Sequence, residues 1–230
     1  MLGMDGSSHY CGTPIGRAHS QRIQHMPSQP IQEQFGQTII DSIAEFAIRD
    51  IDNVATMKKS LFSHISDPAL QTTLAETLYG ARWIYKLGLA LLVRDEEQLA
   101  HVRVQLIDYG AVCEGLLVDL IAHGIAKGHL AGARYKFKDV KKLKCPINWS
   151  VKDIQKQVAR QIFYWQIAVA EEENMISIST AKRLDSLRLD RNTVHMAART
   201  SRAYIGRSHT AFETLNIAIT EAKAWKAANP

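Results

Sequence analysis

The chain has 230 residues, of which 46% are hydrophobic and 22% are charged, with a formal net charge of +5 at pH 7. These values are ordinary for a globular protein and suit one domain of generous size or two small ones. The longest apolar run, Leu87 to Val93, is too short for a membrane span of about 20 residues, so we expect no membrane association. Cys11, Cys113 and Cys145 are too widely spaced to suggest a disulfide framework or a zinc site. We therefore expect a cytoplasmic protein without a bound metal or cofactor.

The positive charge is concentrated in two places. Residues 134–144 hold six basic residues against the single acid Asp139, and residues 183–207 hold six arginines against Asp185 and Asp190. Two basic segments on an otherwise neutral chain are typical of a protein with a polyanionic partner. The alternative is that these lysines and arginines form ordinary solvated faces that keep the chain soluble.

The first 30 residues are rich in Gly, Ser, His, Gln and Pro and have no helical period. We expect them to form a disordered arm, and residues 31–230 to form a single domain. From Phe35 to about His64, apolar residues recur at helical spacing and predict one long amphipathic helix. Ser66-Asp67-Pro68 then provides a cap residue and a proline at the first helical position, which predicts a second helix running towards Val93.

The sequence Arg94-Asp95-Glu96-Glu97 marks a turn whose acids favour a new helix N-terminus. The helix that follows carries two adjacent apolar stripes and is expected at the centre of a bundle. Glu114 interrupts the second stripe. Its carboxylate either reaches solvent or is buried and paired with an arginine from a helix near the C-terminus. The first stripe consists of Leu99, Val102, Leu106, Tyr109, Cys113, Leu116 and Leu120, and the second of Ile107, Gly110, Glu114, Leu117 and Ile121.

Gly124, Gly128 and Gly132 are expected to end this helix, and residues 133–148 to form a basic loop. Apolar spacing predicts one helix from about Val151 to Val169, ended by residues 171–174.

Ser177 or Ser179 can cap a helix that runs at least from Ala181 to Val194, and Thr210 with Glu213 forms a capping box for a final helix. No alternating strand pattern is present. The sequence therefore predicts an all-α bundle of five to seven helices.

One stretch, Leu187 to Met196, combines cations, an amide and an imidazole at helical spacing. Arg188, Arg191 and His195 are three, four and seven residues apart, so they project from one helical face that also carries Leu184. Polar groups on a core-facing stripe are costly unless a partner satisfies them, so these side chains either meet a ligand or another chain, or lie at the edge of the stripe.

These residue types can cleave RNA without a metal ion. A histidine can move a proton near neutral pH, and a guanidinium binds phosphate and stabilises the charge of the transition state. Asn192 would orient the substrate or the imidazole, or simply bond the backbone. Because one helix supplies only one histidine, a symmetric homodimer would complete the site.

The stretch "LRLDRNTVHM" (residues 187–196) resembles the signature of the HEPN superfamily (higher eukaryotes and prokaryotes nucleotide-binding domains), an arginine and a polar residue followed by a histidine. The acid in "YGAVCEGLLVDLI", Glu114, is similar to one found in the family's helix preceding the motif. The resemblance covers roughly Leu99 to Ala222. It departs from the signature in two respects. Arg191 is followed by Asn192, but only three residues intervene between Arg191 and His195. Arg188 has the wider spacing, with six intervening residues, but is followed by Leu189.

The resemblance implies an endoribonuclease of the kind found in toxin–antitoxin and antiviral defence systems, acting on RNA as a homodimer, with an antitoxin or another defence protein as a further partner. We take Arg191 as the motif arginine and Arg188 as a second phosphate contact. Two alternatives are a non-catalytic nucleotide- or protein-binding bundle with a structural Arg-Asn-His cluster, and a nucleic-acid-binding regulator that uses the basic loop alone. The candidate catalytic residues are Arg191, His195, Asn192, Arg188 and Glu114, and the candidate RNA-binding residues are Arg134, Tyr135, Lys136, Phe137, Lys138, Lys141 and Lys142.

Overall fold

The computed structural model describes residues 33, 35–130, 154–192 and 205–230. The chain divides into two compact units, residues 1–41 and residues 42–230, and the bundle belongs to the second. The predicted arm of residues 1–30 and the basic loop of residues 133–148 lie outside the described residues.

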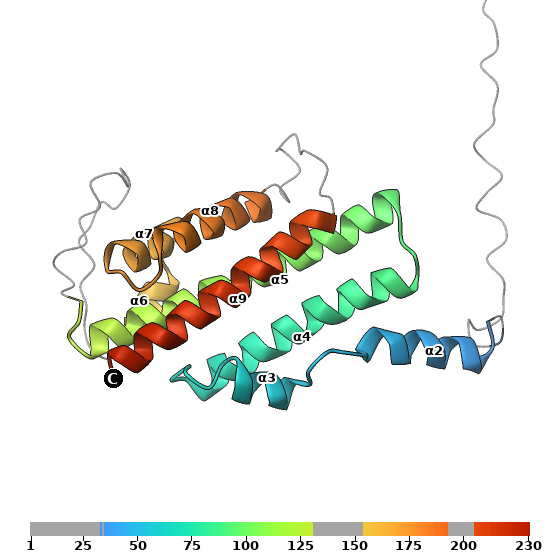
Figure 1. Ribbon diagram of the computed structural model, residues 1–230, viewed down its shortest axis with the longest axis horizontal. Coiled ribbons are helices and arrows are strands. Elements are labelled where there is room, and N and C mark those ends of the chain that lie inside the picture. The colour runs from blue at the N-terminus through green and yellow to red at the C-terminus, as the bar shows by residue number, and fades with distance from the viewer. Residues whose placement is uncertain (1–32, 34, 131–153, 193–204) are drawn as a thin grey trace, which may run out of the picture. The chain divides into compact units, whose positions relative to one another are not determined.

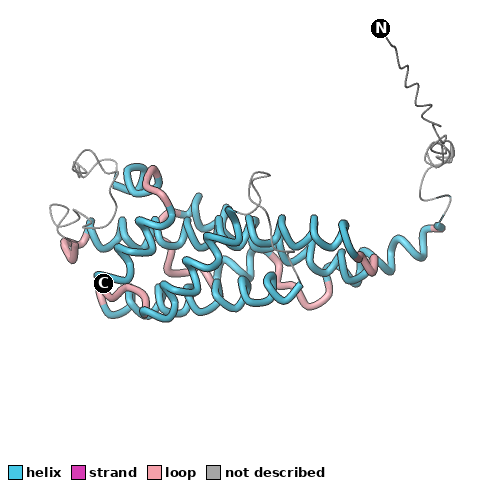
Figure 2. The backbone as a smooth tube through the Cα atoms, turned by 90° about the horizontal axis from the view of Figure 1, so that it is seen from above, coloured by secondary structure: helices cyan, strands magenta, loops and turns pink. Residues whose placement is uncertain are grey.

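All regular secondary structure in the described ranges is helical, as Figure 2 shows, and these ranges contain no strand. This confirms the predicted all-α class. None of the described helices is long and apolar enough to cross a membrane. The helices are α2 (Gln37–Ile48), α3 (Val54–Ser60), α4 (Pro68–Ala90), α5 (Asp95–Ala126), α6 (Ile154–Ala159), α7 (Phe163–Glu172), α8 (Ile178–Asn192) and α9 (Ile205–Ala228).

The single helix predicted from Phe35 to His64 is wrong, because α2 ends at Ile48 and α3 begins at Val54. Asp50 between them has a φ of 62°, a left-handed conformation that interrupts a right-handed helix. Asn53 then starts α3, since its side-chain oxygen accepts a hydrogen bond from the Thr56 amide at 2.9 Å. The apolar spacing continues across this break, which hides it in the sequence.

The predicted helix start at Pro68 is confirmed: the Asp67 carboxylate accepts from the Ala69 amide at 2.8 Å. The acids at residues 95–97 likewise form the first turn of α5. That helix ends at Ala126, and Gly128 follows with a φ of 77°, a conformation that glycine adopts at little cost. Gly124, by contrast, lies inside α5.

Two further boundaries differ from the prediction. The helix expected from Val151 to Val169 is divided into α6 and α7 by an extended Ile162, and the buried Gln166 side chain bonds the Gln161 carbonyl at 3.2 Å across this break. Helix α9 begins at Ile205, so Thr210 does not cap it. Its hydroxyl instead donates to the Gly206 carbonyl at 3.0 Å within the helix.

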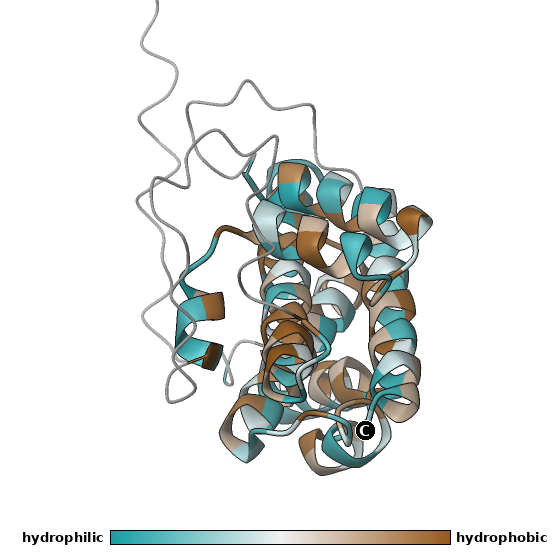
Figure 3. Ribbon diagram, turned by 90° about the vertical axis from the view of Figure 1, so that its left-hand side faces the viewer, coloured by the Kyte–Doolittle hydropathy of each residue, from teal (hydrophilic) through white to brown (hydrophobic). Residues whose placement is uncertain are grey.

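Helix α5 is the centre of the bundle, as its two apolar stripes predict. It contacts α4, α6, α7, α8 and α9, and in Figure 1 α4 runs antiparallel to it while α9 runs alongside in the same direction. Tyr109, Leu116 and Leu117 are among its fully buried side chains. The helices carry hydrophobic and hydrophilic residues together, as amphipathic elements do (Figure 3).

A buried ion pair ties the end of α9 to α5. The Lys226 ammonium contacts the Asp119 carboxylate, and the two side chains are 6% and 5% exposed. Lys226 also donates to the His64 carbonyl at 2.8 Å, and Asp119 accepts from the Ser66 amide at 3.1 Å. Each charge is therefore satisfied by more than its ionic partner, as buried charges require.

Candidate functional site

Helix α8 carries Arg188, Arg191 and Asn192 of the motif and is fixed at both ends. At its start, the Ser177 hydroxyl accepts from the Thr180 amide at 3.2 Å, which confirms one of the two caps expected from the sequence. Glu221 of α9 reinforces this turn by accepting from the Ser177 amide at 2.9 Å and from the Thr180 hydroxyl at 2.8 Å. A carboxylate at a helix N-terminus is favoured electrostatically.

The other end of α8 is held by two ion pairs that point to different helices. Arg191 pairs with Glu114 of α5, and Asp190 pairs with Arg207 of α9 at 3.0 Å. Leu184 and Leu187 are buried between these fixed ends. The rotation of α8 about its axis is therefore set by its core residues and by both neighbouring helices.

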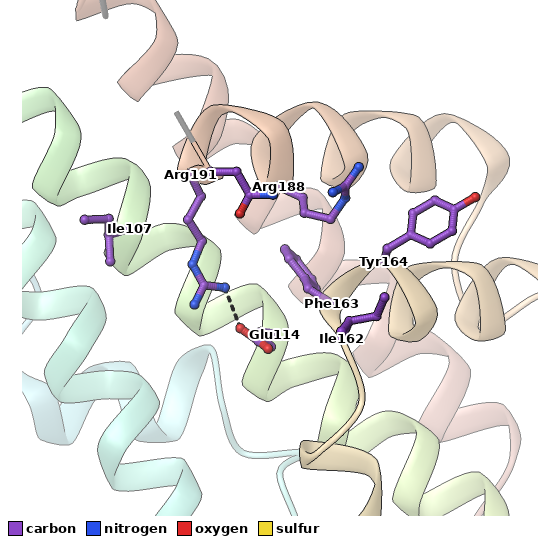
Figure 4. A pocket seen from close by; sticks show the side chains of 8 residues that line it. Ile107, Glu114, Ile162, Phe163, Tyr164, Arg188 and Arg191 are labelled. Atoms are coloured by element: carbon purple, nitrogen blue, oxygen red, sulfur yellow. Dashed lines mark hydrogen bonds and ion pairs between the residues drawn. The ribbon is translucent and has the colours of Figure 1, made fainter. Parts of the chain in front are cut away.

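An open pocket of about 570 Å³ lies where α5, the start of α7 and the end of α8 meet (Figure 4). Four of the five candidate catalytic residues line it: Glu114, Arg188, Arg191 and Asn192. The fifth, His195, lies outside the described residues. The remaining lining residues are Ile107, Ile162, Phe163 and Tyr164.

The central polar contact of the pocket joins Arg191 Nη1 to Glu114 Oε2 at 2.5 Å. The Glu114 carboxylate therefore pairs with an arginine of the motif helix, as one of its two alternatives predicts, but it is only partly buried. The pair is half-buried, with side-chain exposures of 32% for Arg191 and 27% for Glu114. Gly110 makes room for it, since a Cβ atom there would lie only 3.0 Å from Arg191 Cδ.

Arg188 is held against an aromatic ring at the edge of the same pocket. Its Nε donates to Asp185 Oδ1 at 2.8 Å, and its guanidinium carbon lies 5.3 Å from the centre of the Tyr164 ring. This distance permits a cation–π contact. The spacing of Asp185 and Arg188 was available in the sequence, but Tyr164 gives no sequence signal because its contact with Arg188 depends on how α7 packs beside α8.

The pocket suits an anion with an apolar portion. Two guanidinium groups and one carboxylate face it, so the charged lining residues have an excess of one positive charge. Each guanidinium retains N–H donors beyond the one used in its ion pair, and these can bind phosphate oxygens. Ile162, Phe163 and Tyr164, at the start of α7, offer a surface for a flat, uncharged group.

The seven candidate RNA-binding residues of the basic loop, from Arg134 to Lys142, lie outside the described residues. Within the described part of the chain, no three His, Cys, Asp or Glu side chains gather as ligands for a metal ion. Cys113 is buried in the core, where desolvation raises the pKa of its thiol.

No protein-family model matches the chain, and no match was found among curated proteins or solved structures. The HEPN resemblance therefore stays a prediction based on the motif residues.

Proposed function

We propose that this chain is a metal-independent endoribonuclease of the HEPN type. The observation that carries the proposal is the convergence of Arg188, Arg191 and Asn192 in one positively charged pocket at the end of α8. His195 follows Asn192 by three residues in the sequence. Phosphate-binding groups and a proton-transferring group are thus supplied by one short stretch of chain.

The proposed reaction begins when the ribose 2′-oxygen attacks the adjacent phosphorus. The bond from phosphorus to the 5′-oxygen of the next nucleotide breaks, which leaves a 2′,3′-cyclic phosphate and a free 5′-hydroxyl. Arg191 and Arg188 stabilise the negative charge on the phosphoryl oxygens, and Glu114 keeps Arg191 in position. His195 moves the proton, Asn192 orients the substrate, and the histidine of a second copy acts on the opposite side of the phosphate.

This proposal is tested by cleavage of labelled single-stranded RNA in excess EDTA. We expect Arg191→Ala to lower the cleavage rate at least about 100-fold, as loss of a charge-stabilising group does in other enzymes. Arg207→Ala is the matched control, because Arg207 is also 32% exposed and paired with an acid but does not line the pocket. Equal rates for the parent and Arg191→Ala would refute the assigned role of Arg191.

The Arg191–Glu114 pair itself favours a second candidate, a non-catalytic binding bundle in which the cluster is structural. In that case Arg191→Ala would destabilise the fold by about 3–5 kcal/mol, as for a broken buried pair. Our proposal predicts a loss of about 1 kcal/mol or less, because the two side chains are about one-third exposed. Urea unfolding of Arg191→Ala and Arg207→Ala distinguishes the two: similar small losses support the proposed function, and a large loss confined to Arg191→Ala supports the structural role.

A further inference from the structure

We infer that the pocket between α5, α7 and α8 reads an unpaired guanine base in single-stranded RNA, with Glu114 as the residue that determines base specificity. The inference rests on the proposed function for its substrate class. It adds a role for the carboxylate and for the apolar side of the pocket, which phosphate binding alone does not use.

The Glu114 carboxylate has capacity beyond its ion pair. One oxygen, Oε2, contacts Arg191, and the described residues provide no other hydrogen bond to this carboxylate. An ionised carboxylate has about four lone-pair sites and only accepts hydrogen bonds. Among the described residues, nothing but Arg191 occupies these sites, and Glu114 lines the pocket.

Guanine is the base that matches such an acceptor. Its Watson–Crick edge presents two adjacent donors, N1–H and the N2 amino group, which point in the same direction. Adenine and cytosine place an acceptor nitrogen beside their single amino group, and uracil places its N–H between two carbonyl oxygens. A carboxylate therefore attracts the edge of guanine and is repelled by an acceptor atom on each of the other bases.

The opposite wall of the pocket provides a stacking surface. Tyr164 is 40% exposed and Ile162 is 62% exposed, although both are large apolar residues at the start of α7. Figure 4 shows the Arg188 side chain close to the Tyr164 ring at this edge of the pocket. Aromatic rings and guanidinium planes are the groups on which proteins stack unpaired RNA bases.

Size and charge are consistent with one nucleotide. A volume of about 570 Å³ lies within the range of pockets that hold small molecules. With the base between Tyr164 and Glu114, its phosphates would meet the N–H groups of Arg188 and Arg191. Because base pairing occupies the Watson–Crick edge, the substrate must be single-stranded.

The test is binding of fluorescent pentanucleotides measured by anisotropy, with 2′-O-methyl groups throughout to prevent cleavage. The central base is guanine, adenine or inosine, and the four flanking bases are adenine. We expect the guanine strand to bind about tenfold more tightly than the adenine strand, equivalent to about 1.4 kcal/mol. Inosine retains N1–H but lacks the amino group, so its strand should bind with intermediate affinity.

Two variants, Glu114→Gln and Tyr164→Leu, each with a matched control, test whether the pocket binds the strand and reads its central base. Glu114→Gln should bind guanine and adenine strands equally, because an amide donor would then oppose the donors of guanine. Asp190→Asn is the matched control and should retain the preference, since Asp190 is also an arginine-paired acid, 29% exposed, but does not line the pocket.

Tyr164→Leu should weaken binding of every strand at least about fivefold, as loss of a stacking ring does. Trp83→Leu, which alters a 39% exposed aromatic residue of α4, should not.

Equal affinity for the three parent strands, absence of binding, or a preference that survives Glu114→Gln would overturn the inference. Unlabelled 5′-GMP that competes as strongly as the guanine pentanucleotide would overturn the assignment to an RNA strand. These outcomes are separate from the cleavage assay: cleavage without base preference refutes only the guanine pocket, and guanine-specific binding without cleavage refutes only the ribonuclease.

Discussion

Asp190 and Arg191 are adjacent in the chain, yet they reach opposite neighbours of α8. Arg191 pairs with α5 and Asp190 with α9, and each pair is about one-third exposed. Isolated pairs of this exposure add little stability. We therefore interpret the Arg191–Glu114 pair mainly as an orienting contact, which aims the guanidinium of Arg191 into the pocket.

The fold opposes ionisation of the His64 imidazole. Both ring nitrogens are shielded from solvent and have no hydrogen-bond partner among the described residues. Burial lowers the pKa of His64 from 6.5 to about 4, and the nearby Lys226 and Lys223 act in the same direction, while Asp119 partly opposes them. The folded protein therefore holds this imidazole in its neutral form.

This pKa predicts how stability depends on pH. Between pH 6.5 and pH 4 the unfolded chain binds a proton at His64 that the folded chain does not, so the free energy of unfolding falls as the pH is lowered. Allowing for the partial exposure of the ring, we expect this residue to account for about 1–2 kcal/mol of the loss. Urea unfolding across this range should show a shallower loss for His64→Phe than for the parent. His209→Phe alters an exposed histidine and should keep the parent's slope; an unchanged slope in His64→Phe would contradict the prediction.

At the scale of elements, the close approach of α5 to its neighbours depends on several glycines, of which Gly110 and Gly124 are two. A Cβ atom at Gly110 would meet Arg191, and one at Gly124 would overlap Leu130 and lie 2.7 Å from Met175 Cε and 3.2 Å from Trp225. Gly80 of α4 differs, since nothing lies within 4 Å of its added Cβ. The three helical glycines look alike in the sequence and differ only in what packs against them.

We expect Gly124→Ala to lower the free energy of unfolding by about 1–2 kcal/mol, because overpacking outweighs the gain in helix propensity. Gly80→Ala should raise it by about 0.5–1 kcal/mol, since the same gain meets no steric opposition. Urea unfolding at pH 7 measures both. A stabilised Gly124→Ala would show that α5 and its neighbours are less closely packed than described.

Local signals predict most element types and some boundaries. Asp67-Pro68 and the acids at residues 95–97 act within one turn, and the helix starts that they predict are confirmed. The breaks at residues 49–53 and 160–162 were missed because the apolar spacing continues across them. What interrupts these helices is a single left-handed residue, Asp50, in one case and an extended residue, Ile162, in the other.

The candidate site was likewise only partly predictable from local sequence signals. Arg188, Arg191 and Asn192 could be predicted from their spacing on one helix, and Glu114 because it interrupts an apolar stripe. Tyr164 could not, because its place beside Arg188 arises from the packing of α7 against α8. The Lys226–Asp119 pair was missed for a similar reason: 107 residues separate the two side chains, and neither interrupts a pattern that predicts a partner.

At the scale of the whole molecule, the bundle brings the two halves of the described chain together around α5. Helix α4 precedes it, whereas α6 to α9 follow it and pack against it. The pocket uses this arrangement, since its acid comes from α5, its aromatic rings from α7 and its guanidinium groups from α8. The chemistry proposed for the chain therefore depends on the bundle being assembled.

The most direct test of the proposed function is cleavage of 5′-labelled single-stranded RNA in excess EDTA by the parent and by His195→Ala. The proposal predicts products with 2′,3′-cyclic phosphate or 3′-phosphate ends from the parent. It predicts a rate at least about 100-fold lower for His195→Ala, with unchanged unfolding in urea. Equal cleavage by the two proteins, or no cleavage by either, would contradict a ribonuclease built on this motif.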